Sequence, residues 1–499
     1  MLSQVHTLAL CGVEAQDVLV EVDLAGGLPL FDIVGLPDAS VRESRNRVRA
    51  ALRNSGFGFP SGRVTVNLAP AHMPKAGPAF DLPIAVALLA AWGRLPPACT
   101  QKSVFAGELA LDGRLRSVQG AVCLATAHVS PETPELLVLP TANQVELALM
   151  GSTRQLQLAD TLCDVVAWLQ GRSSLQPVNL QPESEANVEH LDLQDVIGQT
   201  SARRALEIAA AGRHNLLLVG PPGTGKTMLA ARLPSILPPP TEAEALEIAR
   251  VYSAAGLLGG EHSFPLTRPF RAPHHTITPG GMIGGGTGLR PGEVTLAHHG
   301  VLFLDEFSEF RTDVLCALRE PIEEGWVRVT RGMRSARFPA DFQLVAATNP
   351  CPCGWQGDSR RRCSCTDGDL HRYRRRMNGP LLDRIDMFVA LQSSVEFGST
   401  QEEQIGESSA AIADRVRAAW QRQLERAMLA NSRLSPRDTR QHCGLDDAGV
   451  ALLQSAVRRQ VLTGRGVDRV LRVARTIADL NARDHIALED VAEALSYRQ

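Results

Sequence analysis

The spacing of hydrophobic residues divides the chain into segments of different character. Over residues 1–170, short apolar runs typical of β-strands alternate with stretches whose apolar residues recur at helical spacing. The strand-like runs are Val18–Val22, Val64–Asn67 and Leu136–Leu139, and the helical stretches are Ser40–Gly56 and Leu82–Trp92. This alternation predicts one α/β domain. Residues 171–190 are rich in Ser, Gln, Pro and Glu and contain few large apolar residues, which predicts a linker.

Two further regions follow the linker. Residues 191–395 combine strand-like apolar runs with glycine-rich turns and helical stretches, so a second α/β domain is expected there. In residues 396–499, apolar residues recur at spacings of three and four over successive stretches, which predicts a small helical bundle.

Composition and charge exclude several classes of protein. The 499 residues carry 51 Lys and Arg against 54 Asp and Glu, a formal net charge of −3, so any contact with nucleic acid must come from local patches. Aromatic residues make up 4%, which argues against recognition by stacked rings. The sequence has neither a bilayer-spanning apolar run nor a secretory signal, and its ten cysteines are too sparse for a secreted disulfide scaffold. We therefore expect a cytoplasmic protein without a membrane partner.

A phosphate loop is the strongest chemical signal in the sequence. Asn215–Val219 is an apolar strand-like run, GPPGTGKT fits the pattern G-x-x-x-x-G-K-[ST], and an amphipathic stretch follows. The residues expected to contact the nucleotide are Gly220, Pro221, Pro222, Gly223, Thr224, Gly225, Lys226 and Thr227. The glycines let backbone N–H groups surround phosphates, while Lys226 would reach the β- and γ-phosphates and Thr227 would hold Mg²⁺. ATP and Mg²⁺ are therefore the expected cofactors.

Two further strand ends carry groups that ATP cleavage needs. The apolar run Val301–Leu304 ends in Asp305, a carboxylate suited to Mg²⁺, and Glu306, which can polarise the attacking water as a general base. A third run, Phe342–Ala347, leads to Asn349, whose amide can orient the same water or sense the γ-phosphate.

Several strings, taken together, resemble the AAA+ ATPases, and more narrowly the magnesium chelatase-like branch. These are DVIGQ (Asp195–Gln199), GPPGTGKT, LFLDE, ATNP and GPLLDRID. FRAPHHT (Phe270–Thr276), PGEVTLAHHGVLFLDEF (Pro291–Phe307) and NPCPCG (Asn349–Gly354) are similar to the ComM (YifB) family, and the resemblance extends over essentially the whole chain.

The resemblance implies a ring-forming ATPase, usually a homohexamer, with a parallel-sheet core and a C-terminal helical lid. It implies branch migration on branched DNA during natural transformation and homologous recombination, with a recombinase as a candidate partner. In that family Asn349 matches sensor 1, Arg384 matches the arginine finger that reaches a neighbour's γ-phosphate, and Arg465 matches sensor 2, although Arg469 is close enough to compete. An always-charged planar guanidinium suits a γ-phosphate that gains charge during transfer.

Two segments of residues 191–395 are expected to lie near DNA. Six glycines between Gly280 and Gly288 predict a flexible loop, where the resemblance places the helix-2 insert. Gly325–Phe342 predicts a β-hairpin with a Gly-Met turn, which corresponds to the family's pre-sensor hairpin. Its four arginines, three residues apart, cannot all share one strand face: Arg328, Arg331, Arg334 and Arg337. We expect some of them to contact phosphates; the alternative is a solvated hairpin.

Two pairs of adjacent histidines raise the question of a metal site. They are His274 with His275, and His298 with His299. Adjacent side chains in a loop or strand are expected to point apart, which disfavours a shared ion, so we interpret these residues as structural or pore-facing.

Four cysteines within fifteen residues predict a zinc site. They are Cys351, Cys353, Cys363 and Cys365, in the pattern C-P-C-G-x₈-C-S-C. Paired thiolates on two short turns suit tetrahedral Zn²⁺, with His371 as a reserve ligand, and disulfides are the rival interpretation. Seven arginines surround the second half of the cluster: Arg360–Arg362, Arg372 and Arg374–Arg376. The hypothesis is that the metal holds together a basic loop that contacts DNA or the next subunit.

The first 170 residues contain a second resemblance. PKAGPAFDLPIA (Pro74–Ala85) and GELALDGRLRSVQGAV (Gly107–Val122) resemble the Lon-protease catalytic domain, of the ribosomal-protein-S5 fold type, in which a Ser–Lys dyad acts. By motif alignment, Ala79 occupies the serine position and Val122 the lysine position, and neither side chain can attack or take a proton. We therefore predict no peptidase activity and a role as a scaffold that caps the ring or binds DNA or a partner.

The ATPase core by itself does not distinguish between motors. The alternatives are a chelatase-type motor that remodels a partner for metal insertion into a porphyrin, and a protease-associated unfoldase. The Lon-like region and the cysteine cluster favour the DNA motor, because chelatase motor subunits resemble only the core. The phosphate loop with Asp305 and Glu306 excludes a pure binding module.

Overall fold

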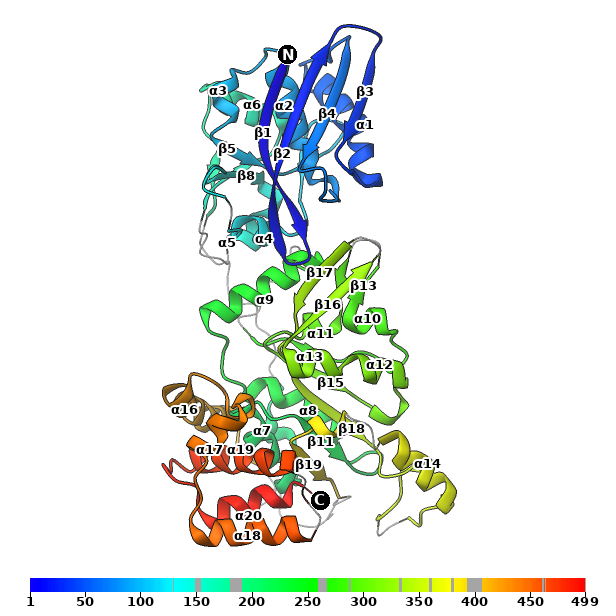
Figure 1. Ribbon diagram of the computed structural model, residues 1–499, viewed down its shortest axis with the longest axis vertical. Helices are drawn as coiled ribbons and strands as arrows, with labels where there is room; N and C mark the ends of the chain where they lie inside the picture. Colours follow the sequence, from blue (N-terminus) through cyan, green and yellow to red (C-terminus); the bar gives the residue numbers. More distant parts are fainter. Residues whose placement is uncertain are drawn as a thin grey trace.

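The described residues form an elongated molecule with two large sheets and three two-stranded sheets. The structure is a computed structural model that describes residues 1–128, 130–148, 154–179, 191–258, 267–286, 289–331, 334–358, 361–377, 381–392, 406–459, 462 and 464–498. The N-terminal sheet lies at one end, the five-stranded core sheet and the C-terminal helices lie at the other, and a middle segment separates them (Figure 1). Most of the predicted linker (180–190) and the predicted boundary at 395–396 lie outside the described residues.

The N-terminal sheet has eight strands in the order β10-β9-β8-β5-β1-β2-β4-β3. Their bounds are β1 (Leu2–Cys11), β2 (Glu14–Ala25), β3 (Leu30–Val34), β4 (Arg63–Ala69), β5 (Ser103–Phe105), β8 (Leu136–Pro140), β9 (Gln155–Ala159) and β10 (Gln176–Pro177), with the separate pair β6 (Glu108–Leu109) and β7 (Leu115–Arg116). The helices are α1 (Ala39–Asn54), α2 (Asp81–Ala91), α3 (Pro97–Thr100), α4 (Ala121–Ala125), α5 (Gln144–Ala148) and α6 (Leu162–Leu169). Because α2 is apolar all round, it is buried on every side.

The core sheet has five strands, all parallel, in the order β12-β15-β18-β11-β19. The strands are β11 (Leu216–Val219), β12 (Phe270–Arg271), β15 (Val301–Leu304), β18 (Gln343–Thr348) and β19 (Met387–Ala390). Helices α7 (Thr200–Gly212) and α8 (Lys226–Arg232) flank β11 in the sequence. The predicted parallel sheet is therefore confirmed, and its carboxyl ends meet at one edge, where ligands bind in such folds.

A middle segment rises from the core towards the N-terminal domain (Figure 1). It contains α9 (Glu242–Ala255), α10 (Pro279–Ile283), β13 (Gly284–Gly285), β14 (Arg290–Pro291), α11 (Glu293–Leu296), α12 (Thr312–Ala317), α13 (Arg319–Glu324) and the antiparallel hairpin β16 (Trp326–Arg331) and β17 (Arg334–Pro339). The expected loop over 280–288 is wrong for 280–285, which form a helix and a strand. Pro279 starts α10, Thr278 caps it by accepting from the Gly281 N–H, and β13 pairs with β14. Residues 287–288 and the Gly-Met turn at 332–333 lie outside the described residues.

The C-terminal region is helical, as predicted. It comprises α16 (Ser409–Ala427), α17 (Pro436–His442), α18 (Asp447–Arg458), α19 (Gly464–Leu480) and α20 (Leu488–Ser496). An apolar stripe on α19, with Val470, Val473 and Ile477, packs with α7 and α16 into the same buried cluster as β11. No helix in the part of the chain that the structure describes has the length and apolar character that crossing a bilayer requires.

Candidate nucleotide-binding site

The phosphate loop lies where three parallel strands end. β11 leads into the loop, β15 leads into Asp305 and Glu306, and β18 leads into Asn349. Since β18 lies between β11 and β15, the three strand ends are neighbours. Gly223 and Gly225 have φ of 78° and 83°, a left-handed conformation that glycine adopts without strain. Gly225 caps the N-terminus of α8, so the N–H groups at that helix end face the loop.

Lys226 joins the phosphate loop to Asn349. Its Nζ donates to the carbonyl oxygens of Gly220 at 2.7 Å and Pro221 at 2.9 Å, and to Asn349 Oδ1 at 3.2 Å. Burial lowers the pKa of Lys226, while Asp305 opposes the shift. The three oxygens hold the amine at the loop, where the more negative oxygens of a triphosphate would replace them as acceptors.

Thr227 and Asp305 form an oxygen-rich pair beside the loop. The Thr227 hydroxyl donates to Asp305 Oδ2 at 2.6 Å, and Asp305 Oδ1 accepts the Glu306 N–H at 2.9 Å. Hydroxyl and carboxylate oxygens are the ligands that Mg²⁺ prefers, so these side chains fit the ion that accompanies ATP.

Glu306 is exposed and contacts His275, which the sequence analysis interpreted as structural or pore-facing. Its backbone is left-handed, with φ of 51°, and its carboxylate Oε2 lies 3.3 Å from His275 Nδ1. His275 follows β12, the edge strand beside β15. The only sequence signal for this contact is that both residues follow neighbouring parallel strands.

The expectation that adjacent histidines point apart is wrong for both pairs. The ring centroids are 4.1 Å apart for His274 and His275 and 3.8 Å apart for His298 and His299. His299 has φ of 56°, which departs from the extended backbone on which the expectation rested. Both rings of the second pair contact one carboxylate: Glu247 Oε2 lies 2.9 Å from His298 Nε2 and 2.8 Å from His299 Nε2.

Tautomer chemistry argues against a metal at this second pair. The backbone N–H of Asp341 donates to His298 Nδ1 at 3.1 Å, so the proton of a neutral His298 ring must be on Nε2. That nitrogen therefore donates to Glu247 and has no lone pair for an ion. The pair fastens α9 to the start of β15, which is a structural role.

Arg384 lies at the opposite edge of the sheet from the phosphate loop. It ends a short helical turn, Leu382–Arg384, just before β19, and its carbonyl accepts from Asn215 Nδ2 at 2.9 Å just before β11. β11 has four residues, which at about 3.3 Å each separates the two edges by roughly 13 Å. The Arg384 guanidinium pairs with Glu323. The structure therefore does not bring Arg384 to the phosphate loop of its own chain.

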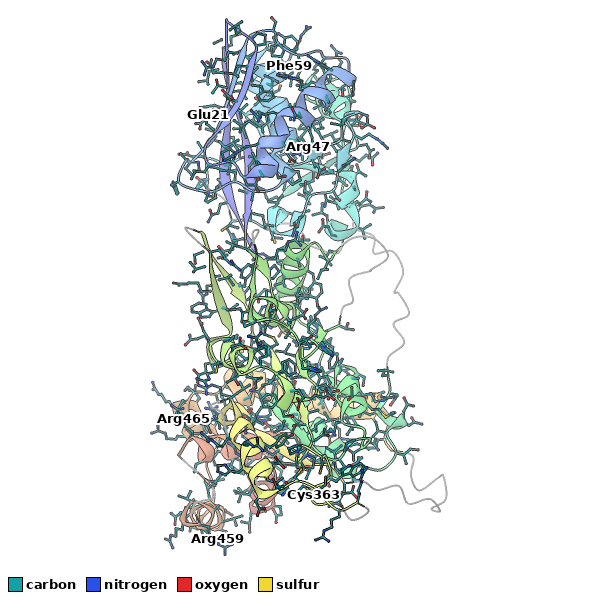
Figure 2. All side chains as sticks on the ribbon, turned by 90° about the vertical axis from the view of Figure 1, so that its right-hand side faces the viewer. Glu21, Arg47, Phe59, Cys363, Arg459 and Arg465 are labelled. Carbon is teal, nitrogen blue, oxygen red and sulfur yellow. The ribbon has the colours of Figure 1, made fainter. Side chains whose placement is uncertain are left out.

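The two sensor 2 candidates occupy the start of α19. Arg465 is exposed on the first turn (Figure 2), and Arg469 Nε lies 3.7 Å from Asp386 Oδ1. Because Asp386 precedes β19, Arg469 also lies at the amino edge of the sheet. Neither arginine has a recorded contact with the phosphate loop in the described part of the chain.

The four cysteines converge on one point. Sulfur–sulfur distances are 3.4 Å for Cys351 and Cys353, 3.7 Å for Cys351 and Cys363, and 3.5 Å for Cys353 and Cys363, and the Cys365 sulfur lies within 4.8 Å of the others. Zn–S bonds of about 2.3 Å in a tetrahedron place sulfurs about 3.8 Å apart, so the donor set fits zinc. The Trp355 and Ser364 N–H groups lower the pKa of the Cys353 thiol to about 5. His371 is not part of this cluster.

The cysteine segment is fastened to the nucleotide site. A Cβ on Gly354, whose φ is 85°, would lie 2.8 Å from Pro222 Cδ in the phosphate loop, so only glycine fits there. Tyr373, on α14 (Asp367–Met377), donates its hydroxyl to the Asn349 carbonyl at 2.7 Å. Arg361 stacks on Trp355 at 4.8 Å, and Arg361, Arg362, Arg372 and Arg375 are exposed. Arg360 and the side chains of Arg374 and Arg376 lie outside the described residues.

Comparisons with known proteins identify the family. "Magnesium chelatase, subunit ChlI" matches residues 192–397, "Subunit ChlI of Mg-chelatase" matches 20–143, and "Magnesium chelatase, subunit ChlI C-terminal" matches 406–498. The whole chain is 44% identical to YifB of Salmonella typhimurium and 42% identical to Competence protein ComM of Haemophilus influenzae, covering 97% of each. The chain belongs to the ComM/YifB family of magnesium chelatase-like AAA+ proteins. A shorter match, 26% identical over 214 residues and 38% of each chain, is to Lon protease 2 of Bacillus subtilis.

In this ComM/YifB-family chain the two side chains predicted to occupy the Lon-type dyad positions pack against apolar clusters. Ala79 is partly buried and packs against a core cluster of the N-terminal domain, and Val122 is buried against Ala249 of α9. Neither side chain can act as a nucleophile or a base, and the absence of peptidase activity stays a prediction.

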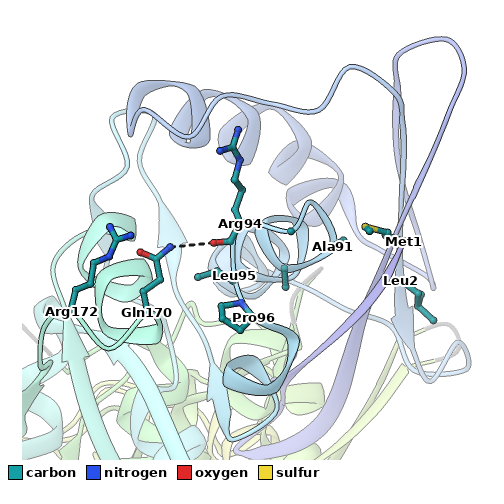
Figure 3. Close-up of a pocket in the computed structure, with 10 residues that line it drawn as sticks. Met1, Leu2, Ala91, Arg94, Leu95, Pro96, Gln170 and Arg172 are labelled. Carbon is teal, nitrogen blue, oxygen red and sulfur yellow. Dashed lines mark hydrogen bonds between the residues drawn. The ribbon is translucent and has the colours of Figure 1, made fainter.

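A hollow of about 730 Å³ lies at the far end of the N-terminal domain (Figure 3). Met1, Leu2, Arg94, Pro96 and Arg172 line it, and Gln170 Nε2 donates to the Arg94 carbonyl at 3.2 Å. None of the nucleotide-site residues of the ComM/YifB-family chain contributes to it.

Lys226→Ala is expected to weaken ATP binding by about 10- to 100-fold, because a charge-assisted contact contributes about 1.5–3 kcal/mol. Fluorescent ATP titration of the purified ComM/YifB-family chain measures the change. Lys102→Ala, at an exposed lysine, is the matched control. Unchanged affinity in Lys226→Ala would contradict the assignment of the phosphate loop.

Proposed function

We propose that this chain hydrolyses ATP as part of a ring, a homohexamer, and uses the energy to move on branched DNA. The observation that supports a ring assembly is that the proposed catalytic groups lie at opposite edges of the core sheet. Lys226, Asp305 and Glu306 lie at the carboxyl edge, and Arg384 lies at the amino edge. A head-to-tail arrangement of subunits would complete each site from two chains.

At the carboxyl edge each group has a distinct task in this proposal. The phosphate loop and Lys226 bind the β- and γ-phosphates. Thr227 and Asp305 would hold Mg²⁺, which neutralises phosphate oxygens when bound. Glu306 takes a proton from the attacking water, and Asn349 orients that water. Arg384 of the neighbouring subunit stabilises the charge that develops on the γ-phosphate.

The contact between His275 and Glu306 supports a link between the middle segment and ATP cleavage. His275 precedes α10, and its ring lies 3.3 Å from the proposed base. Movement of the middle segment would change the freedom of Glu306 to approach water. In the proposal, DNA engaged by this segment therefore alters ATP turnover.

The hairpin β16–β17 supports DNA as the substrate. Arg328 and Arg337 are directly opposite in its antiparallel register, and both guanidinium groups lie over Trp326, at 5.7 and 4.2 Å from the ring centre. Like charges in facing positions repel, so this pair suits a surface that receives a polyanion. Arg331 is exposed at the turn. Similarity to the relative named Competence protein ComM supports the proposed role in transformation and recombination, with a recombinase as a candidate partner.

The decisive experiment measures ATP turnover with and without a synthetic four-way junction, followed by strand separation on that junction. We expect stimulation by the junction and separation that requires ATP. Because phosphate contacts release counterions, binding should weaken steeply with salt. Arg328→Ala with Arg337→Ala should reduce the salt slope, and Arg437→Ala, at an exposed arginine of α17, is the control. A flat salt slope and no response to the junction would instead favour a chelatase-type motor or an unfoldase acting on a protein partner.

We further propose that the four cysteines bind Zn²⁺ and so shape the segment that packs on the phosphate loop. Elemental analysis of the native protein is expected to find about one zinc per chain. Cys363→Ser should lose the metal and weaken ATP binding, because Gly354 lies against Pro222. Cys316→Ser, at an exposed cysteine outside the cluster, is the control. A metal-free native protein whose four thiols all react with an alkylating reagent would refute the zinc site.

A further inference from the structure

The N-terminal domain is joined to the rest of the chain by a contact far from the linker. The first turn of α4 meets the last turn of α9 (Figure 1). Gly120 N–H donates to the Ser253 carbonyl at 3.0 Å, and Val122 N–H donates to Ser253 Oγ at 3.2 Å, across 131 residues of sequence. N–H groups at a helix start lack partners within their own helix, and here Ser253 accepts two of them, with its hydroxyl and with a carbonyl that also accepts from Gly256 N–H.

The centre of this contact is apolar and closed to water. Val122 and Ala249 have exposed fractions of 0% and 1%, and Leu246 and Leu258 pack against them. Cys123, also fully buried, donates its thiol to the Arg250 carbonyl at 3.2 Å. Burial raises the pKa of this thiol to about 12.

A buried carboxyl completes the contact. Glu146 accepts from the Ser253 hydroxyl at 2.8 Å and from the Asn143 side-chain amide, and burial raises the pKa of Glu146 to about 7. Ser253 thus accepts from Gly120 and Val122 of the N-terminal domain and donates to Glu146. Leaving a buried polar group unpartnered is costly, which opposes partial separation of the two surfaces.

A second contact prevents rotation about the first. The turn between β1 and β2 rests on the hairpin, where a Cβ on Gly12 would lie 3.2 Å from Ala336 Cβ. Nearby, the Arg250 guanidinium donates to the Val13 carbonyl at 3.1 Å. Val13 and Cys123 belong to the same apolar cluster as Phe338 of β17.

We infer that the N-terminal domain, α9 and the hairpin β16–β17 move as one rigid unit. The unit is held together by the packing of Val122 on Ala249, which we call the seat. Val122, which occupies the predicted position of the catalytic lysine of Lon-like domains, therefore serves here as a packing contact between the N-terminal domain and α9. The N-terminal domain would then travel with the hairpin during each cycle of ATP cleavage, a consequence that rests on the proposed function.

Alkylation of Cys123 tests the rigid unit in the full chain. N-ethylmaleimide labelling, followed residue by residue with mass spectrometry, is compared without nucleotide, with ADP and with a non-hydrolysable ATP analogue. Cys163 and Cys316 are exposed and serve as internal references. We expect Cys123 to react at least about tenfold more slowly than either reference in all three states, because it is buried and protonated. Reaction at the rate of Cys316 in any state would overturn the inference.

Ala249→Asp is designed to separate Val122 from α9. It tests whether strand separation requires the N-terminal domain to move with the hairpin. The buried carboxylate should raise the Cys123 labelling rate at least about tenfold, keep basal ATP turnover within about twofold and abolish strand separation. Ala243→Asp, at an exposed position of the same helix, is the matched control. Strand separation at the wild-type rate in an opened variant would overturn the transmission. If the wild-type chain does not act on DNA, the proposed function fails, while the labelling of Cys123 still decides the rigid unit.

Discussion

Glu306→Gln is expected to bind ATP with unchanged affinity and to lose turnover by about 10²- to 10⁴-fold, the usual contribution of a general base. The amide keeps the size of the side chain and cannot take the proton of the attacking water. The carboxylate is exposed and contacts His275, so the substitution leaves the packing of the core unchanged. Phosphate release under single-turnover conditions, together with ATP titration, measures the two properties separately.

Glu309→Gln is the control for this prediction, because Glu309 is an exposed glutamate three residues further along the same turn. It should turn over ATP at the wild-type rate. Turnover within tenfold of wild type in Glu306→Gln would assign the base to another residue, whereas loss of ATP binding would show that Glu306 supports the pocket rather than the chemistry.

Arg384→Ala should lose turnover by about 10³-fold or more while retaining ATP binding, since a guanidinium supplied by a neighbour contributes 10³–10⁵ in comparable ATPases and GTPases. Arg384→Lys should recover little, because an ammonium lacks the planar pair of donors. The Arg384 carbonyl, which holds Asn215, is unaffected by either substitution, so the core fold should persist. Steady-state turnover and thermal unfolding are the measurements.

A mixing experiment makes this prediction specific to a shared site. Lys226→Ala and Arg384→Ala are each expected to be inactive alone, but in mixed rings about a quarter of the interfaces would pair an intact phosphate loop with an intact arginine. We therefore expect turnover to reappear on mixing. Mixed rings that are verified by native mass spectrometry and stay inactive would place Arg384 outside the neighbour's site. Full activity of a strictly monomeric chain would have the same consequence.

The core and its phosphate loop could be predicted from the sequence because their signals are local. Apolar runs such as Val301–Leu304 end in chemically distinctive residues, and parallel pairing brings those ends together at one edge. The geometry of His298 and His299 could not be predicted, because it depends on the left-handed backbone of His299, a conformation that the sequence indicates less clearly at a histidine than at a glycine.

Contacts between distant segments were the second kind of failure. The approach of Gly354 to Pro222 and the seat of Val122 on Ala249 leave no periodic pattern in either segment. The sequence showed that Val122 cannot act as a base, which is a statement about its chemistry. Its use as a packing surface depends on where α9 lies in the folded chain.

The hydrogen bond between Asn215 and Arg384 would link ATP cleavage at successive sites of the ring. Asn215 directly precedes the short strand that leads into the phosphate loop, and Arg384 is the group proposed to contact the nucleotide of the neighbouring subunit. A displacement of Arg384 would therefore also displace Asn215 in the same chain, and with it the strand that leads into the phosphate loop. Occupancy would pass from interface to interface around the assembly, so that ATP concentration curves should be sigmoidal rather than hyperbolic.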